Sequence, residues 1–343
     1  MAKRRLTERQ KQRISAIQEK RRQRANEKNK EPDGTLGSEQ TGTIISHHGR
    51  SVVVENTQHK LIRCSVRQNL KALVCGDSVV WQPVKKPEEE TTGNTLQQGI
   101  VTAIQPRQSL LARQLPGGEI KSVAANVDQI AIMVATKPAL SEDLIDRYLV
   151  NAEITDIKPI IVVNKIDLLD KDEFIELKQK MKLYSDIGYP VLFFSVNQNT
   201  GINEVTEKLA QKTSILVGQS GVGKSSLVKQ LLPEQEITIG ELGDTDLGKH
   251  TTTTSVLYHL HCGGNLIDSP GVRDFGVWHV DKEKIAKGFI EFKDYQGRCK
   301  FRNCSHTTEP ECAFKEAVQT GKISQRRLES YLSILESIKD NHS

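Results

Sequence analysis

The sequence lacks long hydrophobic runs, and its first residues lack an apolar segment. The longest apolar run lies near residues 129–135 and is far too short to cross a bilayer. Charged residues begin at Lys3, so we expect no secretory signal, a cytoplasmic protein and no membrane partner. Aromatic residues make up only 5% of the chain, which argues against a large aromatic-rich module.

Cysteines are also few, and their arrangement is not that of a disulfide framework. Of the six, Cys299, Cys304 and Cys312 cluster with His306, whereas the others are scattered. Three thiolates and one imidazole suit one structural Zn²⁺ ion, with no open position for catalysis. The alternative is a loop of free thiols. Four basic residues surround the ligands and could contact phosphate: Lys293, Arg298, Lys300 and Arg302.

Positive charge is concentrated at one end of the chain. Residues 1–30 contain 12 Lys and Arg against 3 Asp and Glu, although the whole chain has a net charge of only +5. Too few apolar residues occur in 1–37 to form a core, so we expect a basic flexible tail. Such a tail favours contact with nucleic acid, and a merely solvated leader is the alternative.

Two regions with different strand patterns follow. Residues 38–110 contain five short β-rich runs separated by Gly and Asn, which predicts an OB-fold barrel with a mobile loop at 85–94. Residues 111–277 alternate continuous apolar runs with helical patterns at 141–153 and 172–185, which predicts an α/β domain. Its expected strands are at 129–135, 159–163, 190–195 and 214–217.

Residues 278–343 combine the Cys/His cluster with apolar residues at helical spacing between Leu328 and Ile338. We expect a zinc-binding helical domain in which that stripe serves packing. The predicted fold class is therefore multi-domain α/β: a barrel, a nucleotide-binding domain and a helical zinc knuckle.

A complete G-x-x-x-x-G-K-[ST] motif begins at Gly218, between a strand pattern and a helix pattern. The glycines allow backbone N–H groups to approach phosphate, and the following helix presents its positive end. Lys224 would reach the β- and γ-phosphates, and Ser225 would bind Mg²⁺. The alternative is an ordinary glycine-rich turn. The expected phosphate-binding residues are Gly218, Gln219, Ser220, Gly221, Val222, Gly223, Lys224, Ser225 and Ser226.

The base is indicated by Asn164, Lys165, Ile166 and Asp167, which follow a buried strand pattern. The Asp167 carboxylate can accept from the two N–H donors of guanine, a pair that adenine does not offer. Asn164 would support the loop, and the Lys165 stem would cover the ring. A polar strand-end turn is the alternative. Ser195 to Asn197 could also meet the guanine through backbone groups, or form a plain loop.

The remaining nucleotide motifs lie between 248 and 271. Asp268 and Gly271 form a D-x-x-G element, in which Asp268 would hold Mg²⁺ through water and Gly271 would sense the γ-phosphate. Thr251 or Thr252 would complete the Mg²⁺ shell, and the sequence does not separate them. A Pro-Gly turn is the alternative for the D-x-x-G element.

Hydrolysis needs a group that orients water, and Val272 follows Gly271 where Ras-like proteins have glutamine. His250, a titratable side chain next to the switch threonines, is the candidate catalytic residue. It could instead be an exposed loop histidine. Without such a group, intrinsic hydrolysis should be slow.

The base motif precedes the P-loop, whereas the usual order is the reverse. With the motifs at 125–129, 248–252 and 268–271 and the Cys/His set, the chain resembles the bacterial family of ribosome-small-subunit-dependent GTPases from about residue 40 onward. The resemblance implies a circularly permuted GTPase acting late in 30S maturation. It also implies binding to 16S rRNA and GTP hydrolysis stimulated by the subunit; we expect a monomer. An RNA-binding scaffold, or a GTPase regulating another process through protein contacts, remains an alternative.

Overall fold

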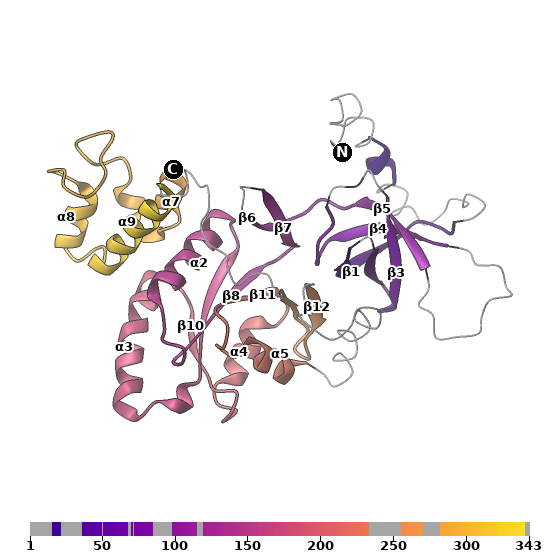
Figure 1. Ribbon diagram of the computed structural model, residues 1–343, viewed down its shortest axis with the longest axis horizontal. Helices are drawn as coiled ribbons and strands as arrows, with labels where there is room; N and C mark the ends of the chain where they lie inside the picture. Colours follow the sequence, from indigo (N-terminus) through magenta and orange to yellow (C-terminus); the bar gives the residue numbers. More distant parts are fainter. Residues whose placement is uncertain are drawn as a thin grey trace.

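The computed structural model describes residues 16–21, 36–49, 51–67, 70, 72–84, 98–114, 119–232, 255–269 and 282–339. A barrel lies at one end of the molecule, an α/β sheet in the middle and a helical module at the other end (Figure 1). The loop expected at 85–94 and most of the tail expected at 1–37 lie outside the described residues. Residues 16–21 are helical, and Arg21 Nη1 donates to the Thr102 carbonyl at 3.2 Å, against the barrel.

Five strands form the expected barrel in the order β1-β2-β3-β5-β4, and β1 pairs with β4 to close it. The β3–β5 pair is parallel and the other pairs are antiparallel, an arrangement that matches the predicted OB-type barrel. Side chains alternate along β2, where Val52 and Val54 point into a core that also contains Trp81. The strands are β1 (Gln40–His48), β2 (Ser51–Asn56), β3 (Leu61–Val66), β4 (Ser78–Pro83) and β5 (Gln98–Ile104).

The central sheet has the strand order β10-β9-β8-β11-β13-β12, with only β12 antiparallel. The four buried runs predicted as strands correspond to β8, β9, β10 and β11. In the described part of the sheet, β12 and β13 had not been predicted. The strands are β8 (Gln129–Ala135), β9 (Lys158–Asn164), β10 (Val191–Phe193), β11 (Thr213–Val217), β12 (Val256–His259) and β13 (Asn265–Asp268).

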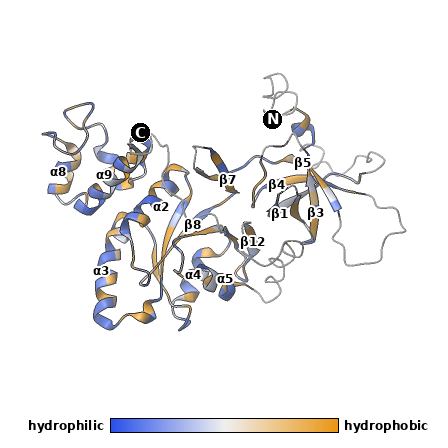
Figure 2. Ribbon diagram, viewed as in Figure 1, coloured by the Kyte–Doolittle hydropathy of each residue, from blue (hydrophilic) through white to orange (hydrophobic). Residues whose placement is uncertain are grey.

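Both faces of this sheet are covered, which explains its continuous apolar strands. On β8, Ile130 and Ile132 belong to a core shared with α2 and α3, whereas Ala131 and Met133 belong to a core shared with α4 and α5. Figure 2 shows apolar colour along β8 and mixed polar and apolar colour on α3. The helices are α2 (Glu142–Ile154), α3 (Lys171–Ile187), α4 (Ile202–Leu209) and α5 (Lys224–Leu231).

A hairpin of β6 (Leu110–Gln114) and β7 (Ile120–Ala125) connects the barrel to the sheet. Its Leu111 side chain shares the α/β core with Ile45 and Cys75 of the barrel region. The barrel also pairs directly with the sheet, because Ser46 of β1 lies opposite Val256 of β12. The domain boundary that we predict at 110/111 falls within β6.

The C-terminal module packs around an aromatic core formed by Phe289, Phe292, Phe314 and Tyr331. Within the described part of the chain, no helix is both long and apolar enough to cross a bilayer. The elements of the module are α7 (Lys282–Lys287), η3 (Ile290–Tyr295), α8 (Ala313–Gln319) and α9 (Gln325–Lys339), and α9 contains the predicted C-terminal helix.

A buried arginine fastens this module to the α/β sheet. Arg327 of α9 has no exposed side-chain surface, and its Nη1 donates to Asp146 Oδ1 of α2 at 2.5 Å. Its Nε donates to Glu291 Oε1 at 2.6 Å. Burial alone would lower the pKa of Arg327, but the two carboxylates outweigh it and raise that pKa, so the guanidinium stays charged.

Candidate nucleotide site and metal centre

The P-loop turns sharply between β11 and α5, and three of its glycines have positive φ angles. Gly218, Gly221 and Gly223 have φ of 145°, 81° and 98°. A Cβ on Gly218 would lie 2.1 Å from the Met133 carbonyl oxygen of β8. Only glycine therefore allows the loop to pass this close to the neighbouring strand.

The first turn of α5 follows this loop directly. Gly223 is its N-cap residue, and Lys224, Ser225 and Ser226 are its first three residues. Unpaired N–H groups and the positive end of the helix dipole meet there, a combination that favours anions. The Lys224 ammonium folds back over the loop and donates to the Gly218 and Gln219 carbonyls at 2.7 and 2.6 Å.

The base motif lies against the P-loop, although 54 positions separate Asn164 from Gly218. Asn164 ends β9 and is buried; its Nδ2 donates to the Val222 carbonyl at 2.8 Å. The Lys165 ammonium donates to the Gly221 carbonyl at 2.6 Å and to the Lys137 carbonyl at 2.7 Å. The fold therefore brings the two sequence motifs into one site, as the permuted order requires.

Asp167 lies in the short helix η1 (Ile166–Leu168), and its carboxylate is oriented by the loop after β10. Ser195 Oγ donates to Asp167 Oδ1 at 2.5 Å, and Asn197 Nδ2 donates to Oδ2 at 3.4 Å. The Ser195 hydrogen bond is the main reason why the pKa of Asp167 is lowered. The carboxylate is therefore ionised at neutral pH, as an acceptor for two N–H donors must be.

Asp268 ends β13, the strand next to the P-loop strand β11. Burial raises the pKa of Asp268, and the positive charge of Lys224 only partly opposes this shift. The half-buried carboxylate of Asp268 at this strand end could bind a divalent cation. The predicted switch residues His250, Thr251, Thr252, Gly271 and Val272 lie outside the described residues.

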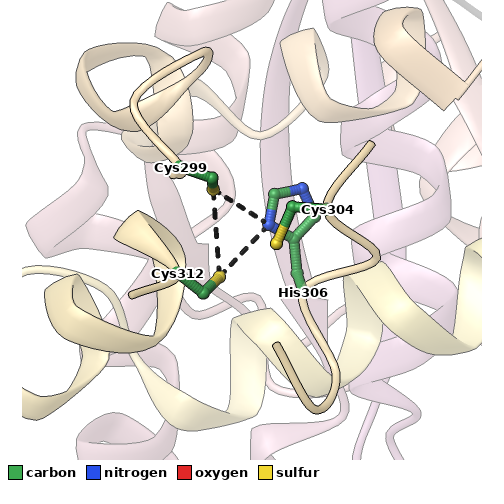
Figure 3. A group of neighbouring side chains, drawn as sticks. All are labelled: Cys299, Cys304, His306 and Cys312. Carbon is green, nitrogen blue, oxygen red and sulfur yellow. Dashed lines mark hydrogen bonds between the residues drawn. The ribbon is translucent and has the colours of Figure 1, made fainter. Parts of the chain in front are cut away.

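The C-terminal cluster brings its four predicted ligands together (Figure 3). Cys299 Sγ lies 3.6 Å from His306 Nδ1 and 4.0 Å from Cys312 Sγ, and His306 Nδ1 lies 3.3 Å from Cys312 Sγ. Every ligand atom, including Cys304 Sγ, lies within 4.8 Å of the others. Tetrahedral zinc with its usual bond lengths separates sulfur from sulfur or sulfur from nitrogen by roughly 3.6–3.8 Å.

The electrostatics of the cluster also fit a cation. Burial, together with the neighbouring thiols, raises the pKa of Cys304 to about 12. A nearby cation would favour loss of this proton and stabilise the thiolate. Burial lowers the pKa of His306, which keeps its imidazole neutral and able to bind metal. The ring is held by stacking on Phe314, with ring centroids 4.1 Å apart. These residues could hold one Zn²⁺ ion in a structural role.

The residues of this chain match one family over the nucleotide site. The RsgA GTPase family model matches residues 104–278. The small ribosomal subunit biogenesis GTPase RsgA of Haemophilus influenzae strain PittGG is 47% identical over 291 residues, which is 84% of this chain and 82% of that protein. The RsgA of Klebsiella pneumoniae is 46% identical over 297 residues, covering 86% and 83%.

The chain belongs to the RsgA GTPase family. It is a P-loop GTP hydrolase, and the GTPases of this class use Mg²⁺ with their nucleotide. Two solved structures are similar to this chain. The crystal structure of YjeQ from Thermotoga maritima has a TM-score of 0.67 at 32% identity and covers 88% of this chain and 98% of YjeQ.

The second solved relative agrees with the order of motifs. YloQ, described as a circularly permuted GTPase, has a TM-score of 0.64 at 28% identity and covers 91% of this chain and 98% of YloQ. In the present structure the strands of the base half, β8 to β10, likewise precede β11, which carries the P-loop. The permutation predicted from motif order is thereby confirmed.

Sequence reasoning missed several side chains of this site. Backbone contacts from Ser195 to Asn197 to guanine stay a prediction; in the structure the side chains of Ser195 and Asn197 also contact Asp167. Thr136, which follows β8, donates to the Lys165 carbonyl at 2.9 Å and had not been considered. No short motif marks these residues, because their roles arise only where neighbouring strand ends meet.

Proposed function

We propose that this GTPase acts in the late maturation of the small ribosomal subunit, where it binds the 30S particle and its 16S rRNA as a cytoplasmic monomer. The observation that carries this proposal is the 47% identity, over 84% of the chain, to a protein named as a small ribosomal subunit biogenesis GTPase. Binding to the subunit would stimulate conversion of GTP to GDP and phosphate.

Guanine recognition rests on Asp167 in this proposal. Its carboxylate, oriented by Ser195 and Asn197, would accept from the ring N–H and the exocyclic amine of guanine. Asn164 would hold the P-loop at the required distance from the base through its 2.8 Å bond to Val222. The stem of Lys165 would cover the ring.

Phosphate and Mg²⁺ binding involve the P-loop and the end of β13. Lys224 would exchange its present bonds to Gly218 and Gln219 for the β- and γ-phosphates. Ser225 and Asp268 would hold Mg²⁺, directly and through water, together with Thr251 or Thr252. Gly271 would contact the γ-phosphate.

His250 is the proposed water-orienting residue, because Val272 cannot perform that role. His250→Ala should lower GTP turnover more than nucleotide affinity. Turnover at saturating GTP and the Kd for GTP would both be measured. Equal losses in the two would instead mean that His250 binds nucleotide or supports the fold.

Three surfaces are suited to RNA. OB-type barrels commonly bind oligonucleotides, and residues 1–30 are strongly basic. Near the Cys/His cluster the side chains of Arg298, Lys300 and Arg302 are exposed, and Phe301 between them is 43% exposed. Cations next to an aromatic ring favour stacking on unpaired bases as well as phosphate contact.

The test is GTP turnover with and without purified 30S subunits, with ATP as the control nucleotide and 50S subunits as the control particle. We expect strong stimulation by 30S alone and no ATP turnover. Tight 30S binding without stimulation would support an RNA-binding scaffold, for which Val272 is the sequence argument. Subunit binding that survives removal of both residues 1–37 and the zinc module would favour a regulator acting through protein contacts.

A further inference from the structure

A second group of metal-ligating side chains lies at the junction between the barrel and the α/β sheet. It consists of Glu55 near the end of β2, His59 in the turn before β3 and His259 at the end of β12. One ligand atom from each lies within 4.8 Å of the other two. The three residues come from two separate parts of the fold, since β12 belongs to the GTPase sheet.

The turn between β2 and β3 holds His59 over Glu55. Asn56 Oδ1 accepts from the backbone N–H groups of Gln58 and Lys60, both at 2.9 Å. His59 takes a positive φ of 58° in this turn, and its Nδ1 lies 3.1 Å from Glu55 Oε1. Glu55 is only 11% exposed, whereas His59 is 81% exposed, so the group faces solvent on one side.

The hydrogen bonds of His259 fix which ring nitrogen faces Glu55. Asn265 Nδ2 donates to Thr213 Oγ1 at 3.2 Å, which directs the amide oxygen of Asn265 toward His259 Nδ1 at 2.8 Å. An amide oxygen only accepts, so His259 Nδ1 carries the hydrogen. In the neutral ring, Nε2 then has a lone pair and lies 2.9 and 3.0 Å from the two oxygens of Glu55.

The Nε2 lone pair of a neutral His259 and the Glu55 carboxylate are both acceptors, so at such short distances they require a proton or a metal ion between them. A proton satisfies the pair when His259 is an imidazolium, and a metal ion satisfies it when the ring is neutral. A histidine that donates its other ring N–H to an amide or carboxyl oxygen is the usual outer-shell arrangement of a metal-binding imidazole. Metal would widen the Nε2–oxygen separation to about 3.4 Å, a small movement for a partly exposed ring.

We propose that Glu55, His59 and His259 bind one divalent transition-metal ion of the zinc type, separately from the Cys/His cluster. Two imidazoles and a carboxylate select Zn²⁺ or Co²⁺ over Mg²⁺, which prefers oxygen ligands. The exposed side near His59 leaves a coordination position for water. The ion would link the barrel to β12. The two are also joined by the strand pairing of Ser46 with Val256.

The test uses the tag-free full-length protein with its structural zinc retained. Equilibrium dialysis against Co²⁺, followed by metal analysis, should find one additional ion per chain. Co²⁺ at this site should show weak visible d–d bands without the near-ultraviolet thiolate band that cysteine ligands produce. Zn²⁺ should also raise the melting temperature of the wild-type protein.

Glu55→Gln and His259→Ala should each weaken uptake of the additional ion at least about 100-fold and abolish the shift in melting temperature. Asn265→Ala should weaken uptake by about 10–100-fold, because it removes only the partner of His259 Nδ1. His261→Ala, an exposed histidine just beyond β12, is the matched control and should bind normally. Melting curves with a weak chelator would check that each variant folds.

Two results would overturn the proposal. One is a wild-type protein that takes up no ion beyond its structural zinc. The other is an additional ion whose uptake is unchanged in Glu55→Gln and His259→Ala, or which shows the thiolate band. In the first case Glu55 and His259 form a protonated ion pair and nothing more.

Discussion

At the scale of single residues, Asp167 depends on its neighbours as much as on its own charge. Ser195 and Asn197 fix the direction of both carboxylate oxygens, and Asn164 fixes the distance to the P-loop. An acceptor held in this way discriminates strongly between purines, because a wrong base leaves it unpaired.

Asp167→Asn should weaken GTP binding on the order of 100-fold and should favour xanthosine triphosphate, whose ring offers an acceptor where guanine has its amine. Ser195→Ala is the informative companion, since it keeps the carboxylate but removes its orienting donor. We expect about a tenfold loss for that variant without a change in base preference. Competition binding with both nucleotides measures this, and an unchanged preference in Asp167→Asn would refute the role.

Ionisation of Asp268 lowers the stability of the nucleotide-free protein. Burial raises its pKa above the ordinary value of 3.8, so the folded state holds the proton more tightly than the unfolded chain. The contribution of Asp268 to stability is therefore greatest at low pH and declines as pH rises from about 3.8 through the folded pKa. Nucleotide with Mg²⁺ would remove this penalty.

Asp268→Asn cannot titrate, so it should melt at a higher temperature than the wild type at pH 7 and lose this advantage below pH 4. The same variant should lose Mg²⁺-dependent GTP binding. Melting curves of both nucleotide-free proteins between pH 4 and pH 7, with and without EDTA, measure this difference in melting temperature. A variant that is less stable at pH 7 would contradict the assignment of the shift to burial.

The sequence motifs located the proposed base and phosphate residues, which the fold brings together, because such motifs depend on short local spacing. Ser195 and Thr136 could not be recognised in the same way. Each acts on the base motif from a different strand end, and a hydroxyl after a buried strand is common in loops. Their roles required the parallel arrangement of β8, β9 and β10.

At the scale of elements, the P-loop is fixed by its approach to β8. Gly218 has no room for a side chain, whereas Gly188, which caps α3 and also has a positive φ angle, has open space around its Cβ position. Comparing the two glycines separates backbone strain from steric overlap.

Gly188→Ala should cost about 1–2 kcal/mol of unfolding free energy, the penalty of a left-handed alanine. Gly218→Ala should cost about 1–3 kcal/mol more, because its Cβ would meet the Met133 carbonyl, and it should also abolish nucleotide binding. Urea unfolding and nucleotide titration of both variants give the comparison. Equal costs would show that the loop can move away from β8.

Elements with a strong local pattern were the ones predicted from sequence. The runs at β8, β9 and β11 are apolar throughout, because both faces of the sheet are covered. The hairpin β6–β7 and the strands β12 and β13 were not predicted, since they are short and contain polar residues, so that they lack the continuous apolar pattern of the central strands. The short elements α7, η3 and α8 pack around aromatic residues rather than showing a long periodic stripe.

At the scale of the whole molecule, Arg327 links the C-terminal module to the α/β sheet. Its partner Asp146 is 181 positions away, and both side chains are fully buried. The sequence does not reveal this role, because nothing local distinguishes a buried arginine from an exposed one.

Arg327→Ala should destabilise the protein by about 3–5 kcal/mol, since it removes the ion-pair partner of Glu291 and leaves the buried Asp146 with Arg326 alone as its counter-ion. Arg326→Ala is the comparison: its side chain is 26% exposed and also pairs with Asp146, at 3.1 Å, so we expect a smaller loss than for Arg327→Ala, because Asp146 keeps its bond to Arg327. Urea unfolding followed by tryptophan fluorescence and circular dichroism compares them. Similar losses for both variants would mean that the fully buried Arg327 contributes no more to the attachment than the partly exposed Arg326.

The attachment of β1 to β12 bears on how the enzyme can be dissected. The first 104 residues supply Ile45 and Cys75 to the α/β core and the ladder partner of Val256. Excising them would leave a hole beside Leu111 and uncover the outer edge of β12, whose free N–H and C=O groups could recruit strands from other copies. A catalytic fragment that begins after residue 104 is expected to aggregate. Shortened versions of the protein should therefore retain the barrel.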